Sequence, residues 1–262
     1  MKQYSTLQNI WRGFWPLLAY FFFPIVIMNL TYWGLRITTD SYNADQLMNQ
    51  NAILLTGIIL SFSLSLWIPL WNKTKKTHVT LNNGKLNIAQ VALTVVLFLA
   101  GLLLVVVLVG NILTPDDLDA FLSMFTMESL LVRIVVIGFI GAIVEELVFR
   151  GVLLNRLSTW MPAWVAVLAS SIIFGLIHFN LIQILYAIPM GALLAVAYMR
   201  TRNMWIPIIG HIAFNLASVF AIHYVETTGS GWPGLIVAIP AVVLIAGSGL
   251  LLWRVSCEVE QA

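Results

Sequence analysis

Charged residues and cysteines are both scarce in this chain of 262 residues. Only 9% of the residues are charged, whereas a soluble domain usually carries about 25%. The formal net charge is +2 and the basic residues are scattered, so nothing indicates a nucleic-acid partner. The single cysteine, Cys257, excludes an intramolecular disulfide and a metal site built from several thiolates. Internal repeats and low-complexity linkers are also lacking, so the sequence predicts a single domain that spans residues 1–262.

Hydrophobic residues make up 60% of the chain and gather in long runs. A helix needs about 20 mostly apolar residues to cross the ~30 Å hydrocarbon core of a bilayer. The sequence therefore predicts an integral membrane protein of the all-α class, a bundle of about eight transmembrane helices. The expected spans are 13–35, 51–71, 88–112, 130–157, 162–178, 180–200, 204–224 and 233–254. Between the third and fourth spans, the segment 116–128 has apolar residues at helical spacing and is expected on the membrane surface.

The placement of lysine and arginine predicts that both termini are cytoplasmic. With the N-terminus inside, all basic residues but Arg36 and Arg133 fall on the inner side, whereas the outer loops carry acidic residues. The inner set is Lys2, Arg12, Lys73, Lys75, Lys76, Lys85, Arg150, Arg156, Arg200, Arg202 and Arg254. The 10 tryptophans lie near the ends of the predicted spans, where such side chains anchor a helix at the interface.

Three ionisable residues interrupt the apolar run of the fourth span: Glu145, Glu146 and Arg150. Charge at membrane depth costs at least a few kcal/mol, so such residues are functional candidates. Adjacent residues on a helix point about 100° apart, so the two glutamates cannot share one role. Glu146 and Arg150 have the i,i+4 spacing of an ion pair. We expect Arg150 to neutralise Glu146 while Glu145 faces the bundle interior unpaired. The alternative is that both glutamates form ion pairs for packing alone.

Other apolar segments contribute His178, His211 and Asn215. His211 and Asn215 are four residues apart and share one helix face. Counting from the inner turns at ~1.5 Å per residue, these three groups and Glu145 fall within roughly 12 Å of one another along the membrane normal. Taken singly, a histidine or asparagine in a membrane helix can simply bond a neighbouring backbone group.

The residues at this polar centre are compatible with two kinds of chemistry. Glu145 and a histidine can hold and deprotonate a water molecule, while the second histidine and the Asn215 amide donate to an oxyanion. Alternatively, Glu145, His178 and His211 could bind zinc, with water at the open position. The chain has no His-Glu-x-x-His helix. Both options stay open, with a slight preference for water activation without a metal.

Three motifs occur in order along the chain: Glu145-Glu146-Leu-Val-Phe-Arg150, Phe174-Gly-Leu-Ile-His178 and His211-Ile-Ala-Phe-Asn215. Together they resemble the CAAX-protease and bacteriocin-processing (CPBP, or Abi) family of intramembrane endopeptidases, over about 128–220. The first three spans match that family only in being hydrophobic.

The resemblance implies that Glu145 and His178 activate water, His211 and Asn215 stabilise the oxyanion, and Glu146 and Arg150 support them. It implies a peptide or protein substrate in the membrane, prenylated or bacteriocin-like. The family is often labelled metalloprotease, although a glutamate mechanism without metal is also argued for it. Two other classes remain: a non-catalytic immunity or scaffold protein that retains the motifs, and a transporter, since intramembrane acids also mark ion paths.

Overall fold

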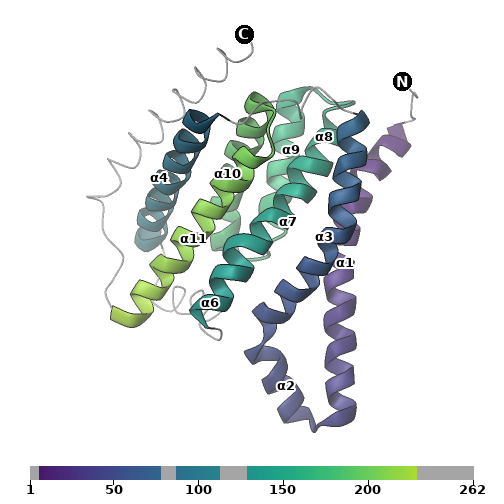
Figure 1. Cartoon of the computed structure of the whole chain (residues 1–262), viewed down its shortest axis with the longest axis vertical. Helices are drawn as coiled ribbons and strands as arrows, with labels where there is room; N and C mark the ends of the chain where they lie inside the picture. The colour runs from purple at the N-terminus through teal and green to yellow at the C-terminus, as the bar shows by residue number, and fades with distance from the viewer. Residues whose placement is uncertain (1–5, 78–86, 113–128, 229–262) are drawn as a thin grey trace.

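A computed structural model describes residues 6–77, 87–112 and 129–228, and every regular element in these ranges is helical (Figure 1). This confirms the all-α class. The elements are α1 Thr6–Thr38, α2 Ser41–Gln50, α3 Ala52–Thr77, α4 Ile88–Ile112, α6 Leu130–Arg133, η2 Ile134–Gly141, α7 Ala142–Glu146, η3 Leu147–Leu154, α8 Asn155–Leu157, α9 Ala163–Leu176, α10 Leu181–Thr201 and α11 Trp205–Thr228.

The first seven expected spans each coincide with a helix or a continuous helical run. The eighth, 233–254, and the expected surface segment 116–128 lie outside the described residues. Within the described residues, four helices are long and apolar enough to cross a membrane: Ile10–Thr38, Ala52–Lys73, Gln183–Thr201 and Trp205–Thr228. The full number of transmembrane helices and the sidedness of the termini stay predictions.

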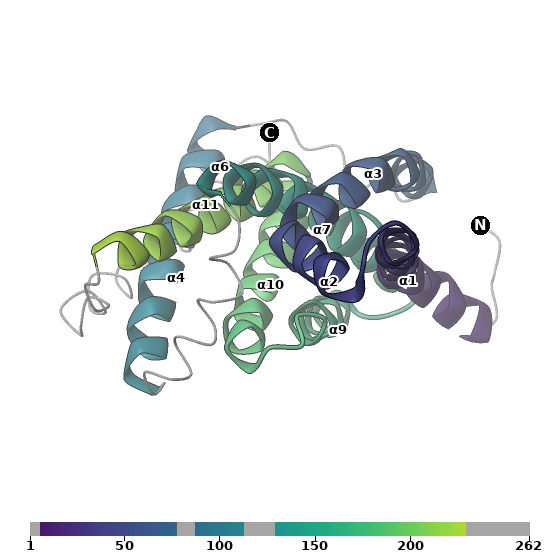
Figure 2. The same ribbon diagram turned by 90° about the horizontal axis from the view of Figure 1, so that it is seen from below.

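The elements α6, η2, α7, η3 and α8 follow one another without a break and form one helical run over 130–157. Seen from below, this run lies amid α1, α3, α9, α10 and α11 (Figure 2). All eight residues of η3 are buried, and all but Arg150 and Gly151 have large apolar side chains. Neighbours come close at two glycines. A Cβ on Gly138 would lie 2.5 Å from Leu216 Cδ2, and one on Gly151 would lie 2.8 Å from Trp71 Cδ1.

The 3.6-residue period of the sequence predicts a plain α-helix over 130–157, but η2 and η3 are π-helical. In each of the two segments a side-chain amide donates a hydrogen bond to a backbone carbonyl. Asn215 Nδ2 donates to Ile137 O at 2.9 Å, and Asn155 Nδ2 donates to Gly151 O at 2.9 Å. A side chain that competes for a carbonyl loosens the ordinary helical ladder locally. π-helical turns of this kind are frequent at functional sites.

Helix α2 is absent from the prediction, which treats the segment between the first two spans as an outer loop. It begins at a capping residue that the sequence does contain: the Asp40 carboxylate accepts from Asn43 N at 2.9 Å. This hydrogen bond lowers the pKa of Asp40 below its usual range. An aspartate before a short polar helix is a recognised start signal, but the segment lacks the apolar run used to find the spans.

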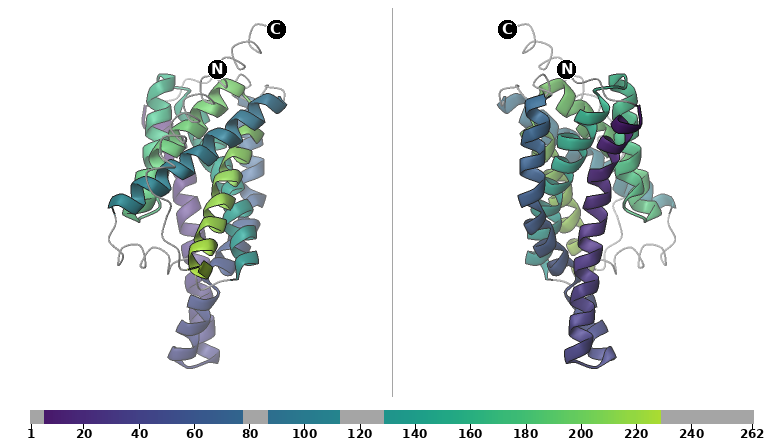
Figure 3. Two further views of the ribbon diagram at one scale, coloured as in Figure 1. Left: turned by 90° about the vertical axis from the view of Figure 1, so that its left-hand side faces the viewer. Right: turned by 90° about the vertical axis from the view of Figure 1, so that its right-hand side faces the viewer.

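The outside of the bundle is apolar and its two ends are charged. Large exposed side chains lie along the helices, among them Phe22, Leu30, Trp33, Phe62, Leu168 and Phe220. The end that is uppermost in Figures 1 and 3 holds the start of α1, the end of α3, α8 and the end of α10. Those segments carry Arg12, Lys73, Arg156, Arg200 and Arg202. At the opposite end Arg133 binds Glu226 with two hydrogen bonds of 2.8 and 3.0 Å. This polarity supports the predicted orientation in the membrane.

Candidate active site

The two adjacent glutamates of α7 lie in different environments. Glu146 has a fully buried side chain, whereas the side chain of Glu145 is 18% exposed. The difference follows from their angular separation of about 100° on the helix. One carboxylate therefore belongs to the packed interior and the other can meet water or a substrate.

The buried carboxylate of Glu146 is held by two cationic or polar partners. Arg150 Nη1 donates to Glu146 Oε1 at 2.6 Å, which is the predicted i,i+4 pair. His211 Nδ1 lies 2.8 Å from the same oxygen. Arg150 Nη2 donates to the backbone oxygen of Gly191 at 3.0 Å, and its guanidinium lies 4.6 Å from the centre of the Phe174 ring. Helices α7, η3, α9, α10 and α11 thus meet at one ion pair.

His211 connects the two glutamates. A carboxylate only accepts hydrogen bonds, so Nδ1–H of His211 donates to Glu146. The other ring nitrogen, Nε2, lies 3.7 Å from Glu145 Oε2. The expectation that Glu145 is unpaired is therefore wrong. Its carboxylate faces His211 from α11 and also lies near the phenol of Tyr20 from α1.

His178 is linked to this cluster by the ring of Phe174, which contacts both histidines. Its Nδ1 lies 2.9 Å from Phe174 O, and a carbonyl only accepts, so Nδ1–H donates; in the neutral imidazole this leaves the lone pair on Nε2. The ring of Phe174 contacts His178 and His211 edge-on, at centroid distances of 5.2 and 5.8 Å. The motif Phe174–His178 therefore fixes the ring and the histidine together at the end of α9.

Asn215 lies one turn beyond His211 on α11, and its Nδ2 donates to Ile137 O at 2.9 Å. The sequence prediction gives this amide to an oxyanion, whereas here one of its two N–H groups joins α11 to η2. The structure thus brings Glu145, Glu146, Arg150 and His211 into one cluster. Asn215 lies one turn from His211 and hydrogen-bonds the backbone of η2.

Comparison with known proteins agrees with the motifs. Residues 127–217 match the family model described as "Type II CAAX prenyl endopeptidase Rce1-like". The chain carries an Rce1-like domain. A Bacillus subtilis (strain 168) protein named "Putative membrane peptidase YdiL" is 34% identical over 89 residues, which cover 34% of this chain. The match spans only 36% of that relative's length. No solved structure matches the chain.

The Rce1-like domain holds all the site residues expected from the sequence: Glu145, Glu146, Arg150, His178, His211 and Asn215. The family expected from the three motifs is thus confirmed at the level of this domain. The prediction of a single membrane domain over 1–262 stays a prediction. So does its division into N-terminal spans and a core of about 128–220.

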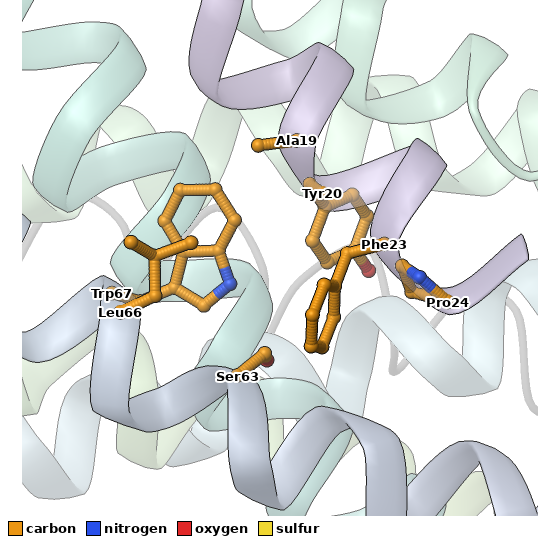
Figure 4. A pocket seen from close by; sticks show the side chains of 7 residues that line it. All are labelled: Ala19, Tyr20, Phe23, Pro24, Ser63, Leu66 and Trp67. Carbon is orange, nitrogen blue, oxygen red and sulfur yellow. The ribbon is translucent and has the colours of Figure 1, made fainter. Parts of the chain in front are cut away.

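Residues outside the Rce1-like domain complete the surroundings of Glu145. Tyr20 of α1 has its phenol near this carboxylate and also lines a pocket between α1 and α3 (Figure 4). The pocket is small and partly open, and its other lining residues are Ala19, Phe23, Pro24, Ser63, Leu66 and Trp67. The rings of Tyr20 and Trp67 face each other across it, with centroids 6.4 Å apart. The sequence prediction missed Tyr20, whose one signal is a phenol inside an apolar run.

The zinc set considered from the sequence does not fit this geometry. Among the described residues, no group of three or more His, Cys, Asp or Glu side chains is arranged to hold one ion. His211 directs Nδ1 to Glu146 and Nε2 towards Glu145, and the Phe174 ring contacts both His211 and His178. In the Rce1-like domain, His211 therefore lies between the carboxylates of Glu145 and Glu146.

Removing the hydroxyl of Tyr20 should slow any reaction that uses Glu145. A hydrogen bond to a charged group contributes about 1.5–3 kcal/mol, so we expect Tyr20→Phe to reduce kcat roughly tenfold or more with little change in folding. Phe23→Leu, which alters the same pocket without touching the carboxylate, is the matched control. A Tyr20→Phe variant with wild-type kcat would show that this phenol does not position Glu145.

Proposed function

We propose that the protein is an intramembrane endopeptidase that hydrolyses a peptide bond in a membrane-associated protein or peptide. The observation that carries the proposal is the difference in environment between the two glutamates. Glu146 is buried and neutralised by Arg150, whereas the carboxylate of Glu145 is partly exposed and lies beside His211. An intramembrane carboxylate with a histidine beside it is suited to general-base catalysis on water.

In the proposed reaction Glu145 takes a proton from a water molecule while the lone pair of His178 Nε2 accepts its other hydrogen. The water oxygen then attacks the scissile carbonyl carbon, and the carbonyl oxygen becomes an oxyanion. His211, with Nδ1–H anchored on Glu146, donates from a protonated Nε2 to this oxyanion, and Asn215 donates its second amide N–H. Glu145 finally passes its proton to the leaving nitrogen as the C–N bond breaks.

The substrate proposed from the family name is a prenylated protein tail, and a bacteriocin-like peptide is the other candidate. Both bring an apolar group to a site that lies among membrane helices.

Loss of the Asn215 amide should slow turnover without affecting metal content. One oxyanion donor is worth roughly 3–4 kcal/mol in the transition state, and the amide is a poor zinc ligand. We expect Asn215→Ala to lower kcat at least roughly tenfold, and elemental analysis of the purified wild type and variant to show far less than one metal per chain. Near-stoichiometric zinc that disappears in His178→Ala would contradict the metal-free proposal.

The proposed function is tested by comparing the C-termini of all cellular proteins in cells with and without this chain. We expect shortened C-termini that depend on the wild-type chain and vanish with Glu145→Gln. A phenotype that persists in Glu145→Gln and His178→Ala cells, with no change in any C-terminus, would instead favour the immunity or scaffold class.

A further inference from the structure

A proline interrupts the backbone hydrogen bonds of α1 beside the pocket between α1 and α3. Pro24 lies inside α1 and lines that pocket together with Tyr20, one turn earlier (Figure 4). Proline has no backbone N–H, so Pro24 cannot donate to the carbonyl of Tyr20 as an ordinary residue would. Helical carbonyls point along the axis towards the residue four positions later. The carbonyl of Tyr20 therefore lies next to the pocket as a hydrogen-bond acceptor.

Helix α3 brings a hydrogen-bond donor to the same pocket. Trp67 is 1% exposed, and its Nε1 is buried with no hydrogen-bond partner among the described residues. Figure 4 shows the indole nitrogen turned towards the space between Tyr20, Phe23 and Ser63. An indole N–H can only donate. The pocket thus contains a buried donor that needs an acceptor.

Ser63 of α3 is a second acceptor in this pocket. Its hydroxyl is buried and donates to Leu60 O at 2.7 Å. A hydroxyl has one hydrogen and two lone pairs, so Ser63 Oγ can only accept from the pocket. One donor and two acceptors therefore meet here. A carbonyl group from a lipid or a peptide could pair only with Trp67, whereas a water molecule can accept one hydrogen bond and donate two.

The depth of these groups makes their pairing important. Helices α1 and α3 each contain a segment long and apolar enough to cross a membrane. Tyr20 lies eight residues beyond Arg12, and Trp67 lies six residues before Lys73. These separations correspond to about 12 and 9 Å along the helices, inwards from the charged end of the bundle. Polar groups at membrane depth must be satisfied within the protein, and ordered waters satisfy carbonyls that a proline has freed.

We propose that the pocket between α1 and α3 is a binding site for a single water molecule. The water accepts from Trp67 Nε1–H and donates to Tyr20 O and Ser63 Oγ, which gives it the three hydrogen bonds typical of a buried water. The pocket is small enough to suit one molecule of this size. The bound water joins α1 to α3 at the proline. The site is independent of the proposed peptidase activity, because none of these hydrogen bonds involves the carboxylate cluster.

The test is radiolytic labelling of the full-length protein in phosphatidylcholine nanodiscs. A short X-ray pulse turns water into hydroxyl radicals, which oxidise the nearest side chains, and mass spectrometry locates the oxidised residues. Phe23, which lines the pocket, is the reporter, and Phe62 on the outside of α3, 71% exposed towards lipid, is the reference. We expect Phe23 to be labelled at least several-fold faster than Phe62. Trp67→Phe should abolish this excess and Ser63→Ala should reduce it.

Ser65→Ala is the matched control, because it removes an exposed hydroxyl of α3 that bonds Phe62 O and should leave the excess unchanged. Equal labelling of Phe23 and Phe62 in the wild type would overturn the proposal. So would an excess that stays the same or rises in both Trp67→Phe and Ser63→Ala, since water would then reach Phe23 without being bound by these groups. An equal loss in Ser65→Ala would also contradict a specific site. Ser63→Ala exchanges one small side chain for another, so the test stands even if Trp67→Phe folds poorly.

Discussion

Replacing Glu145 by glutamine should abolish cleavage while leaving the folded protein intact. The substitution keeps the size of the side chain and its ability to bond Tyr20, but an amide cannot take a proton from water. A general base contributes about 10²–10⁴-fold to a rate, so we expect at least a hundredfold loss of kcat. The measurement is the rate at which membranes containing each variant process a substrate found by its shortened C-terminus.

Two further variants, Asp45→Asn and Glu145→Asp, serve as controls for this prediction. Asp45→Asn removes an exposed carboxylate at the opposite end of the bundle and should leave the rate unchanged. Glu145→Asp keeps the acid but withdraws it by one methylene, so partial activity is expected. Processing by Glu145→Gln at the wild-type rate would contradict the assignment of the base to this residue.

Glu146→Gln and Arg150→Met should each destabilise the protein far more than Glu145→Gln does. Both side chains are buried, at 0% and 1% exposure, and each is the charged partner of the other. Removing one member of a buried ion pair leaves an uncompensated charge and costs about 3–5 kcal/mol. We expect a large fall in the Tm of the purified protein, or a loss of folded yield.

The double variant Glu146→Gln/Arg150→Met separates charge from shape. Replacement of a whole buried pair by uncharged groups of similar volume is often nearly neutral, so the double variant should be more stable than either single variant. It should nevertheless have little activity, because His211 loses the carboxylate that orients Nδ1. Equal stability in all three variants would show that the ion pair does not hold the site together.

The sequence singles out the candidate site residues because their chemistry is visible in an apolar background. Glu146 and Arg150 lie at a spacing that a helix brings onto one face, and the structure contains that ion pair. The first seven predicted spans coincide with helices for a similar reason, since about 20 apolar residues leave few other structures possible in a membrane.

What the sequence prediction misses depends on packing between distant elements. The contact of Tyr20 with Glu145 requires α1 to lie against α7, and no local pattern encodes which helices become neighbours. In each π-helical segment a backbone oxygen accepts a hydrogen bond from a side-chain amide, that of Asn155 or that of Asn215, and Asn215 belongs to another helix. The environment of Glu145 was mispredicted for the same reason: angular position on a helix says which way a side chain points, but not that His211 lies there.

The destination of the oxygen atom from water tests the central claim most directly. A single turnover of the purified protein with its substrate would be run in ¹⁸O-labelled water, and both the product and the peptide containing Glu145 would be analysed by mass spectrometry. If Glu145 is a general base, the new C-terminal carboxylate gains one ¹⁸O atom and Glu145 gains none. An unlabelled product together with ¹⁸O on Glu145 would mean that the carboxylate attacks the peptide itself, and would contradict water activation.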